Sequence, residues 1–403
     1  MNRGLEESVQ CNRSMARRSV TYSDRTAATD RPPSCSLLTA PAAIPVGELV
    51  SFVFQPDPQH PRRRSRTCGH QDLRQAIPCS WEQCHAPEIR GCAKRIKMDS
   101  MPKLKIFVML LSLASFTVMV IMNAGNATGL FKGLFRTTPG NISEKYSTDF
   151  TPAGWTFLIW NVIYAWQLAW LLYALSGICR RNELGCVYMK PDFLPIPFYV
   201  AWILNNGLNV GWLFLWDREY LLPALLLLAA LTFTTGAALF ISHRALSIHS
   251  TWFMKGHQAD LWLIRILVQN GLALYATWTT IATLLNFAVV LIYKWDVSNE
   301  TATTASLSIL ALILIMWFCQ ENFFLDKYVR YNLTIYPVVI IALTGSMCKD
   351  FSASSPTTNG IFIVVLLALT CFIFAVRLGL VIRKHSNEQL EAPAPPQPSS
   401  TVA

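Results

Sequence analysis

The sequence predicts an all-α polytopic membrane protein, and three observations support this class. Only 14% of the 403 residues are charged and 52% are hydrophobic, whereas soluble domains carry about 25% charged residues. Apolar runs long enough to cross a bilayer as helices recur along the chain. The short alternating segments of a membrane β-barrel are missing. A soluble single domain, a porin and a nucleic-acid binder are therefore excluded, and the pI near 9.1 reflects Arg and Lys outside the apolar runs.

Eight runs each predict one spanning helix, because each has close to 18 residues or more without a charged side chain. The fold that follows is a bundle of five helices followed by three further transmembrane helices. The runs cover residues 106–122, 150–179, 193–216, 220–242, 266–293, 301–320, 331–348 and 351–376. The predicted organisation is a disordered segment over 1–100, a five-helix domain over 101–295, three additional helices over 296–384 and a Pro-rich disordered tail over 385–403.

The first hundred residues show no helical or strand periodicity and are rich in Arg and Pro, which is typical of disorder. Met98 or Met101 directly precedes the first apolar run, so we expect one of them to be the functional start. Cys79, Cys84, His85 and Cys92 do not follow the paired spacings of zinc ligands. The sequence therefore indicates no metal site and no cofactor.

The charge distribution predicts the orientation. With eight spans, one face carries 14 Lys and Arg residues near the membrane and the other face carries 6. The positive-inside rule places both termini in the cytosol. Three glycosylation sequons lie in loops on the opposite face, at Asn126, Asn141 and Asn299. Both signals favour the secretory pathway or the plasma membrane over the mitochondrial outer membrane.

Aromatic and amide side chains share helix faces inside three of the runs. Residues spaced by three, four, seven or eleven positions lie on one side of a helix. Buried amides need partners in a membrane, so these stripes should face the bundle interior. Two readings stay open, namely hydrogen bonds that only join helices and a flat ligand site with aromatic walls. The stripes are Trp155, Trp160 and Tyr164; Asn205, Asn209, Trp212 and Trp216; and Tyr275, Trp278, Ala282 and Asn286.

The residues that form the stripes also follow a known order of motifs. FTPAGWTFLIWNVIY at residues 150–164 is similar to the opening of the second helix in the TspO/MBR family, the tryptophan-rich sensory proteins and the translocator protein. Asn205-x3-Asn209-x2-Trp212 resembles the family's third-helix Q-x3-N-x2-W. Tyr275-x2-Trp278-x7-Asn286 resembles its fifth-helix motif. The resemblance covers about residues 104–295, and the three later helices have no counterpart in the short members.

Several positions depart from the family pattern. The second-helix motif is one residue short between Trp155 and Trp160, which turns the two side chains by about 100° relative to each other on a helix. Phe150, Ala153 and Leu274 stand where the family has Trp, Pro and Pro. The departures bear most on the orientation of Trp155.

The resemblance implies a five-helix bundle around a site for a flat lipophilic molecule, tetrapyrrole or sterol-like, that is sensed or transported. It also implies contact with membrane lipid, a homodimer, no nucleic acid, and a lid made by residues 150–154. The expected ligand-binding residues are Trp155, Trp160, Tyr164, Asn205, Asn209, Trp212, Tyr275, Trp278 and Asn286.

Other functions fit the sequence less well. An ion-coupled transporter needs ionisable groups inside the membrane, and no apolar run contains Asp, Glu or His. An enzyme needs an acid–base or metal set, and His243, His249, His257 and Asp260 have no shared helical face. We expect no catalytic residues and no enzyme. The alternative that stays open is a membrane receptor or scaffold whose aromatic stripes are only helix packing.

Overall fold

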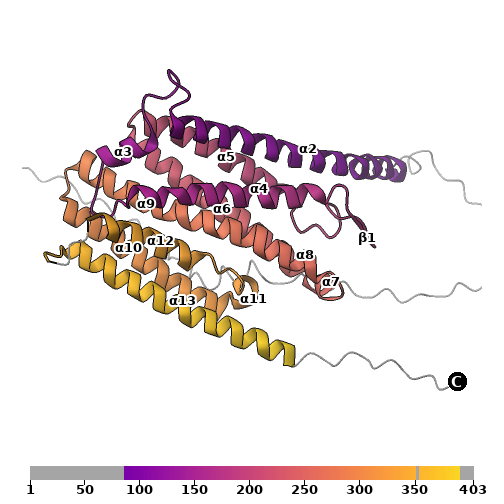
Figure 1. Cartoon of the computed structure of the whole chain (residues 1–403). Coiled ribbons are helices and arrows are strands. Elements are labelled where there is room, and N and C mark those ends of the chain that lie inside the picture. Colours follow the sequence, from indigo (N-terminus) through magenta and orange to yellow (C-terminus); the bar gives the residue numbers. More distant parts are fainter. Residues whose placement is uncertain (1–85, 351–353, 391–403) are drawn as a thin grey trace, which may run out of the picture. The chain divides into compact units, whose positions relative to one another are not determined.

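The structure is a computed structural model that describes residues 86–350 and 354–390 (Figure 1). The predicted disorder of residues 1–85, the zinc alternative at Cys79, Cys84 and His85, and the end of the Pro-rich tail lie outside the described residues. Each of the eight predicted runs contains a helix among its described residues. The chain is an all-α polytopic membrane protein, with six helices long and apolar enough to cross a membrane.

The first four runs form α2, α4, α5 and α6. A 3₁₀ turn, η2, leads into α4, and Pro197 lies in the first turn of α5, where a missing N–H costs nothing. Pro102 lies inside α2. The bounds are α2 Ala86–Thr128, η2 Gly154–Leu158, α4 Ile159–Ser176, α5 Ile196–Asp217 and α6 Leu221–Ile248.

The last four runs form the remaining long helices, two of which contain π-helical turns. The fifth span consists of α8, the π turn η3 and α9, and the sixth consists of α10 and the π turn η4. The bounds are α8 Gln258–Leu263, η3 Ile264–Gln269, α9 Asn270–Trp295, α10 Asn299–Cys319, η4 Gln320–Phe324, α12 Ile335–Asp350 and α13 Thr358–Leu390.

Short elements connect the spans. Thr138 caps α3 by accepting a hydrogen bond from the Asn141 amide, as N-cap threonines do. A two-stranded antiparallel hairpin pairs Arg181 with Cys186. The bounds are α3 Pro139–Lys145, β1 Arg181–Asn182, β2 Gly185–Cys186, α7 Ser250–Met254 and α11 Asp326–Val329.

Two spans differ from the simplest expectation. The 22-residue α5 falls outside the six most apolar helices because the buried amides of Asn205, Asn206 and Asn209 interrupt its apolar surface. The seventh span is shorter than its run, since residues 331–334 form a loop and the apolar helix covers Ile335–Lys349.

The predicted ends of the folded part also shift. α2 begins at Ala86, inside the segment expected to be disordered, and α13 continues through Leu390 into the expected tail. In both places a membrane helix is continued by residues with good helix propensity, such as Glu88, Ala93 and Gln389. Propagating a formed helix costs much less than starting one.

The helices pack in two groups joined by α9. On one side α5 contacts α2 and α6, and α6 contacts α9, while α4 lies against α9 and α2. On the other side α13 packs on both α10 and α12, and α10 and α12 each contact α9 (Figure 1). The central helix α9 is therefore buried along much of its length, and most residues from Asn270 to Tyr275 are buried.

The loops gather at two opposite ends of the helices, because successive spans run in opposite directions. At the Asp149 end, Lys145 pairs with Glu219 and the Tyr293 hydroxyl donates to Ser147 O. At the Asp260 end, Asp260 pairs with Arg180, and Asp192 pairs with Lys105. The ion pairs at each end join residues from different connections, which fixes the order of the loops.

Candidate functional site

An aromatic contact between α4 and α9 forms the centre of the candidate site. The Trp160 ring meets Tyr275 and Trp278 edge to face, at centroid distances of 6.2 and 6.1 Å. Trp160 also stacks on Tyr164 at 5.6 Å. Both α9 rings are 1% exposed. The predicted aromatic stripes of the second and fifth spans thus meet in the bundle interior.

Further rings extend this contact toward α5. Trp202 lies edge to face against Tyr275 at 6.2 Å and against Trp170 at 5.1 Å. Phe157, in η2, packs edge-on against Trp278. Edge-to-face pairs of this kind are favourable beyond the apolar area that they bury. We call the seven rings the aromatic cluster: Phe157, Trp160, Tyr164, Trp170, Trp202, Tyr275 and Trp278.

A chain of neutral hydrogen bonds borders the aromatic cluster. The Asn123 amide donates to Asn209 Oδ1 at 2.7 Å, and the Asn209 amide donates to the Tyr275 hydroxyl at 3.3 Å. These three residues belong to α2, α5 and α9, so the chain crosses the bundle. Asn209 is 1% exposed, and the bonds fix the direction of its amide.

Several buried polar atoms beside these rings are not satisfied. The indole nitrogens of Trp202 and Trp278 and the Asn286 side-chain oxygen have no hydrogen-bond partner among the residues that the structure describes. Asn286 donates only to Ala282 O, one turn back on its own helix. Because nearly all buried polar groups in proteins find a partner, these atoms have unused capacity to bind a polar group.

Three other predicted residues lie apart from the aromatic cluster. The Asn205 amide donates to Leu231 O, Thr234 and Thr235, all in α6. Trp212 stacks on Trp216 at 6.0 Å, beside a smaller apolar cluster that includes Ile142. Trp155 is 49% exposed and lies in η2. The one-residue departure between Trp155 and Trp160 is in keeping with this placement, because it rotates one side chain away from the other.

Sequence reasoning missed the polar side chains that support α4 on α9. Gln167 is fully buried, donates to Gly271 O at 2.9 Å and accepts from the Trp170 indole. The Trp166 indole donates to Ile266 O at 3.1 Å. The Ile266 carbonyl lies in the π turn η3, where the regular helical pattern is interrupted, and the Gly271 carbonyl lies in the first turn of α9. An uncharged Gln inside an apolar run was the available signal.

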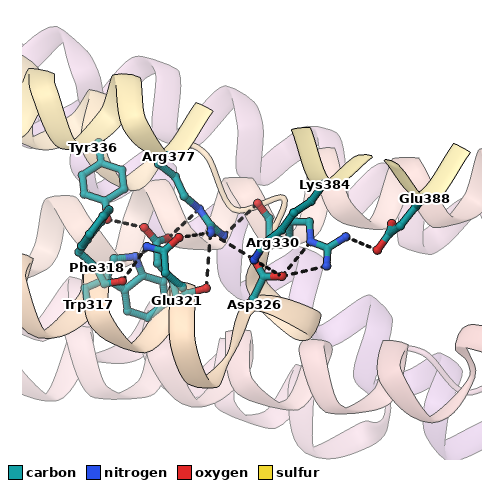
Figure 2. A network of polar contacts seen from close by, with 10 residues as sticks. Trp317, Phe318, Glu321, Asp326, Arg330, Tyr336, Arg377, Lys384 and Glu388 are labelled. Atoms are coloured by element: carbon teal, nitrogen blue, oxygen red, sulfur yellow. Dashed lines mark hydrogen bonds and ion pairs between the residues drawn. The ribbon is translucent and has the colours of Figure 1, made fainter. Parts of the chain in front are cut away.

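A second polar centre lies among α10, α12 and α13 (Figure 2). Glu321 and Arg377 form an ion pair with 3.4 Å between Oε2 and Nε, and both side chains are 0% exposed. Glu321 also accepts from the Tyr336 hydroxyl and from the Trp317 indole. We expected no ionisable group inside the helices, because the sixth and eighth runs end just before these residues. The structure corrects that expectation, since η4 and α13 continue past both positions.

The ion pair belongs to a larger network. Arg377 also reaches Asp326 at 3.3 Å, and Asp326 accepts from Arg330 and pairs with Lys384 (Figure 2). Arg330 pairs in turn with Glu388. We call this set the ion network: Glu321, Asp326, Arg330, Arg377, Lys384 and Glu388. Its three acidic and three basic side chains balance one another.

Asp260 and Arg265, at the start of the fifth span, also have partners in the structure. Asp260 pairs with Arg180 at 2.6 Å and accepts from the Tyr173 hydroxyl, whereas Arg265 lies over the rings of Trp262 and Tyr331. Within the described ranges no group of three or more His, Cys, Asp or Glu side chains could hold a metal ion.

The predicted glycosylation sites differ in accessibility. Asn126 is 2% exposed in the last turn of α2, so a glycan there conflicts with the packed structure. Asn299 is exposed, but its amide nitrogen donates to Asp149 at 2.6 Å. Asn141 is exposed on α3. The Asn141 amide nitrogen also donates, to Thr137 Oγ1 at 3.2 Å, so glycosylation at Asn141 and Asn299 stays a prediction.

The fold and the aromatic cluster together define a class, that of multi-pass helical membrane proteins with aromatic and amide side chains in the bundle interior. The sequence matches the family model described as TSPO-like protein over residues 109–380, and the chain belongs to this family. The match continues beyond residue 295 through α10 and α12 into α13, so the family model includes the helices that the motifs did not cover. Searches of curated proteins and of solved structures gave no match.

Proposed function

We propose that the protein binds a flat, lipophilic and uncharged small molecule at the aromatic cluster, for sensing or transport. The observation that carries this proposal is the pair of unsatisfied polar atoms, Trp278 Nε1 and Asn286 Oδ1, on the helix that also supplies two of the rings. One is a donor and the other is an acceptor. The two residues are eight positions apart on α9, about 12 Å along the helix axis, so a ligand needs two separated polar groups, such as a hydroxyl and a carbonyl, to satisfy both atoms.

The chemistry of the cluster favours an uncharged ligand. Its polar atoms are indole N–H groups, amides and phenol hydroxyls, and none carries a charge. A carboxylate without a cation is costly to bury, and Arg180 and Arg377 are paired with Asp260 and Glu321. A sterol-like lipid or an esterified tetrapyrrole therefore fits better than a tetrapyrrole with free carboxylates.

A binding role fits these side chains better than a catalytic one, because the cluster offers no ionised acid or base for proton transfer. The expected homodimer, the lipid contacts of the outer helix faces, and the cytosolic position of both termini stay predictions. So does the membrane, for which glycosylation at Asn141 would indicate the secretory pathway.

A scaffold is the second candidate, and Asn205 favours it. All the hydrogen bonds that its amide nitrogen donates go to α6, which joins the two helices, while its Oδ1 has no partner within the described residues. If the side chains of the aromatic cluster, like the Asn205 amide, served only to join helices, the aromatic stripes would have a structural role alone. The function would then depend on a partner protein.

The test is a titration of the full chain in lipid nanodiscs, followed by quenching of tryptophan fluorescence. The probes are protoporphyrin and its dimethyl ester, which share the macrocycle but differ in charge, with cholesterol as a competitor. We expect saturable quenching by the ester, at least about tenfold weaker binding of the diacid, which corresponds to about 1.4 kcal/mol, and displacement of the ester by cholesterol.

Single variants locate the site. Trp278→Phe keeps an aromatic side chain but removes the N–H together with the second ring of the indole, and it should weaken ester binding about tenfold, with the loss of one hydrogen bond as the main cause. Trp295→Phe is the matched control, because Trp295 is 52% exposed at the end of the same helix. Equal effects of the two variants, or quenching that never saturates, would refute the proposed site.

A further inference from the structure

The segment before α4 is held by the helices that follow residue 295. This motif segment, residues 147–156, contains the predicted lid and leads directly into Phe157 and Trp160 of the aromatic cluster. Phe150 is 1% exposed and Thr151 is 5% exposed. The position of the motif segment therefore determines where two walls of the candidate site lie.

The first set of contacts comes from α12. The Ala153 amide donates to Gly345 O at 3.0 Å, and the Ser346 hydroxyl donates to Phe150 O at 2.7 Å. Gly345 lies so close to the motif segment that an added Cβ would overlap Thr156 Oγ1 and lie 3.1 Å from Pro152 Cβ. Only a glycine permits this approach of α12 to the segment.

The second set meets at the carboxylate of Asp149. The Asn299 amide donates to Asp149 Oδ1 at 2.6 Å, and the Asn359 amide donates to Oδ2 at 2.9 Å. The Asp149 backbone N–H donates in return to Asn299 Oδ1. Asn299 begins α10 and Asn359 lies in the first turn of α13. One side chain thus joins the motif segment to the starts of two later helices.

We propose that α10, α12 and α13 clasp the motif segment and so control ligand exchange at the Asp149 end, with Asp149 as the positioning residue. This inference rests on the proposed function and gives the last three spans a role in it. The clasp consists of Asn299, Gly345, Ser346 and Asn359.

The chemistry of the clasp suits repeated opening. Its side-chain bonds are amide–carboxylate and hydroxyl–carbonyl bonds. Water can replace the exposed bond between Asn299 and Asp149 when it breaks, whereas Ser346 and Asn359 are only 2% and 1% exposed. The ion network lies at the opposite end of these helices, where it joins η4 to α13, and the Tyr336 hydroxyl of α12 donates to its Glu321. Opening the clasp therefore leaves α10, α12 and α13 assembled.

The test combines two readouts on the full chain in nanodiscs. Hydrogen exchange of the amides in residues 147–156 reports whether the segment is held, and the dissociation rate of protoporphyrin dimethyl ester reports whether it controls exchange. Asp149→Ala should raise both rates about tenfold, as expected for the loss of hydrogen bonds to a charged acceptor. Asn359→Ala should raise both rates in the same direction.

Glu144→Ala is the matched control, because it removes the same charge from an exposed side chain at the same end and should change neither rate. Unchanged amide exchange in Asp149→Ala would overturn the clasp. Faster amide exchange with an unchanged dissociation rate would overturn its control of ligand exchange. If the unaltered protein shows no saturable binding, the proposed function and the exchange role both fail, while the amide data still decide whether the segment is held.

Discussion

The aromatic cluster and the ion network are both buried polar regions, but they differ in the charge of their polar groups and in how these groups are paired. In the ion network, both Glu321 carboxylate oxygens have partners, and Arg377 contacts groups from η4 through Arg330. Arg377 Nε makes no hydrogen bond within the described residues, but it lies 3.4 Å from the charged Glu321 Oε2. In the aromatic cluster, Trp202, Trp278 and Asn286 retain polar atoms without partners in the described part of the chain. Burial alone therefore does not distinguish a site from a structural contact.

The difference indicates two roles. Charged groups in a membrane are stable only when paired, and a neutral network of balanced charges has little capacity left for a ligand. Leaving an uncharged indole or amide group unpaired costs less free energy than leaving a charged group unpaired. Such groups can therefore stay unpaired in the ligand-free protein and form hydrogen bonds when a ligand binds. We therefore assign the ion network to the assembly of the last three helices and the aromatic cluster to binding.

The largest effect should come from breaking the buried ion pair. Arg377→Met leaves the Glu321 carboxylate buried without its cationic partner. It should destabilise the fold by about 3–5 kcal/mol, the usual result of removing one partner of such a pair. Thermal unfolding in nanodiscs, followed by tryptophan fluorescence, measures the loss.

The double variant Glu321→Leu with Arg377→Met sharpens this result. It removes both charges, so most of the lost stability should return. A double variant as unstable as the single one, or a single variant with unchanged stability, would contradict a structural role for the pair.

The next effect distinguishes Asn205 from Asn209, which lie one turn apart on α5. Asn205→Leu should destabilise the fold by about 1–3 kcal/mol, because Leu231 O, Thr234 and Thr235 lose their shared donor. The affinity for protoporphyrin dimethyl ester should stay the same. A drop in affinity without a drop in stability would place Asn205 in the ligand site.

The smallest effect concerns acid. Burial raises the pKa of the Asp326 carboxyl, but hydrogen bonds from Arg330 and Lys384 outweigh it and hold the pKa below the ordinary 3.8. A lowered folded-state pKa adds stability above the unfolded value, and this stability is lost as the pH falls through the folded value. Thermal stability should therefore decline below about pH 3.8, and Asp326→Asn should reduce this decline. An identical decline in the variant would show that other groups cause it.

The sequence was sufficient for the helices and for the direction of the aromatic stripes. Apolar runs determine spans because the bilayer imposes their length, and the spacing of Tyr275 and Trp278 on one face predicted that this face is directed into the bundle interior. Spacing could not say which neighbour each face meets. Asn205 and Asn209 are one turn apart, yet one bonds to α6 and the other to α2 and α9.

The ion network and the clasp could not be predicted for a related reason. Glu321 and Arg377 border apolar runs, where charged residues usually lie at the membrane surface, and they are 56 positions apart in the chain. Asp149 and Asn359 are 210 positions apart. Only the packing of α10, α12 and α13 brings such residues together, and no local pattern in the sequence encodes that packing.

The measurement that tests the central claim most directly is the affinity of protoporphyrin dimethyl ester for a double variant, Trp278→Phe with Asn286→Leu. This variant removes the two unsatisfied polar atoms and leaves apolar side chains at both positions, with a smaller ring at residue 278. We predict that binding weakens about tenfold or more, roughly 1.4 kcal/mol, and thermal stability measures what the smaller buried ring costs in packing. Binding equal to that of the unaltered protein would contradict the account and leave the aromatic cluster as helix packing.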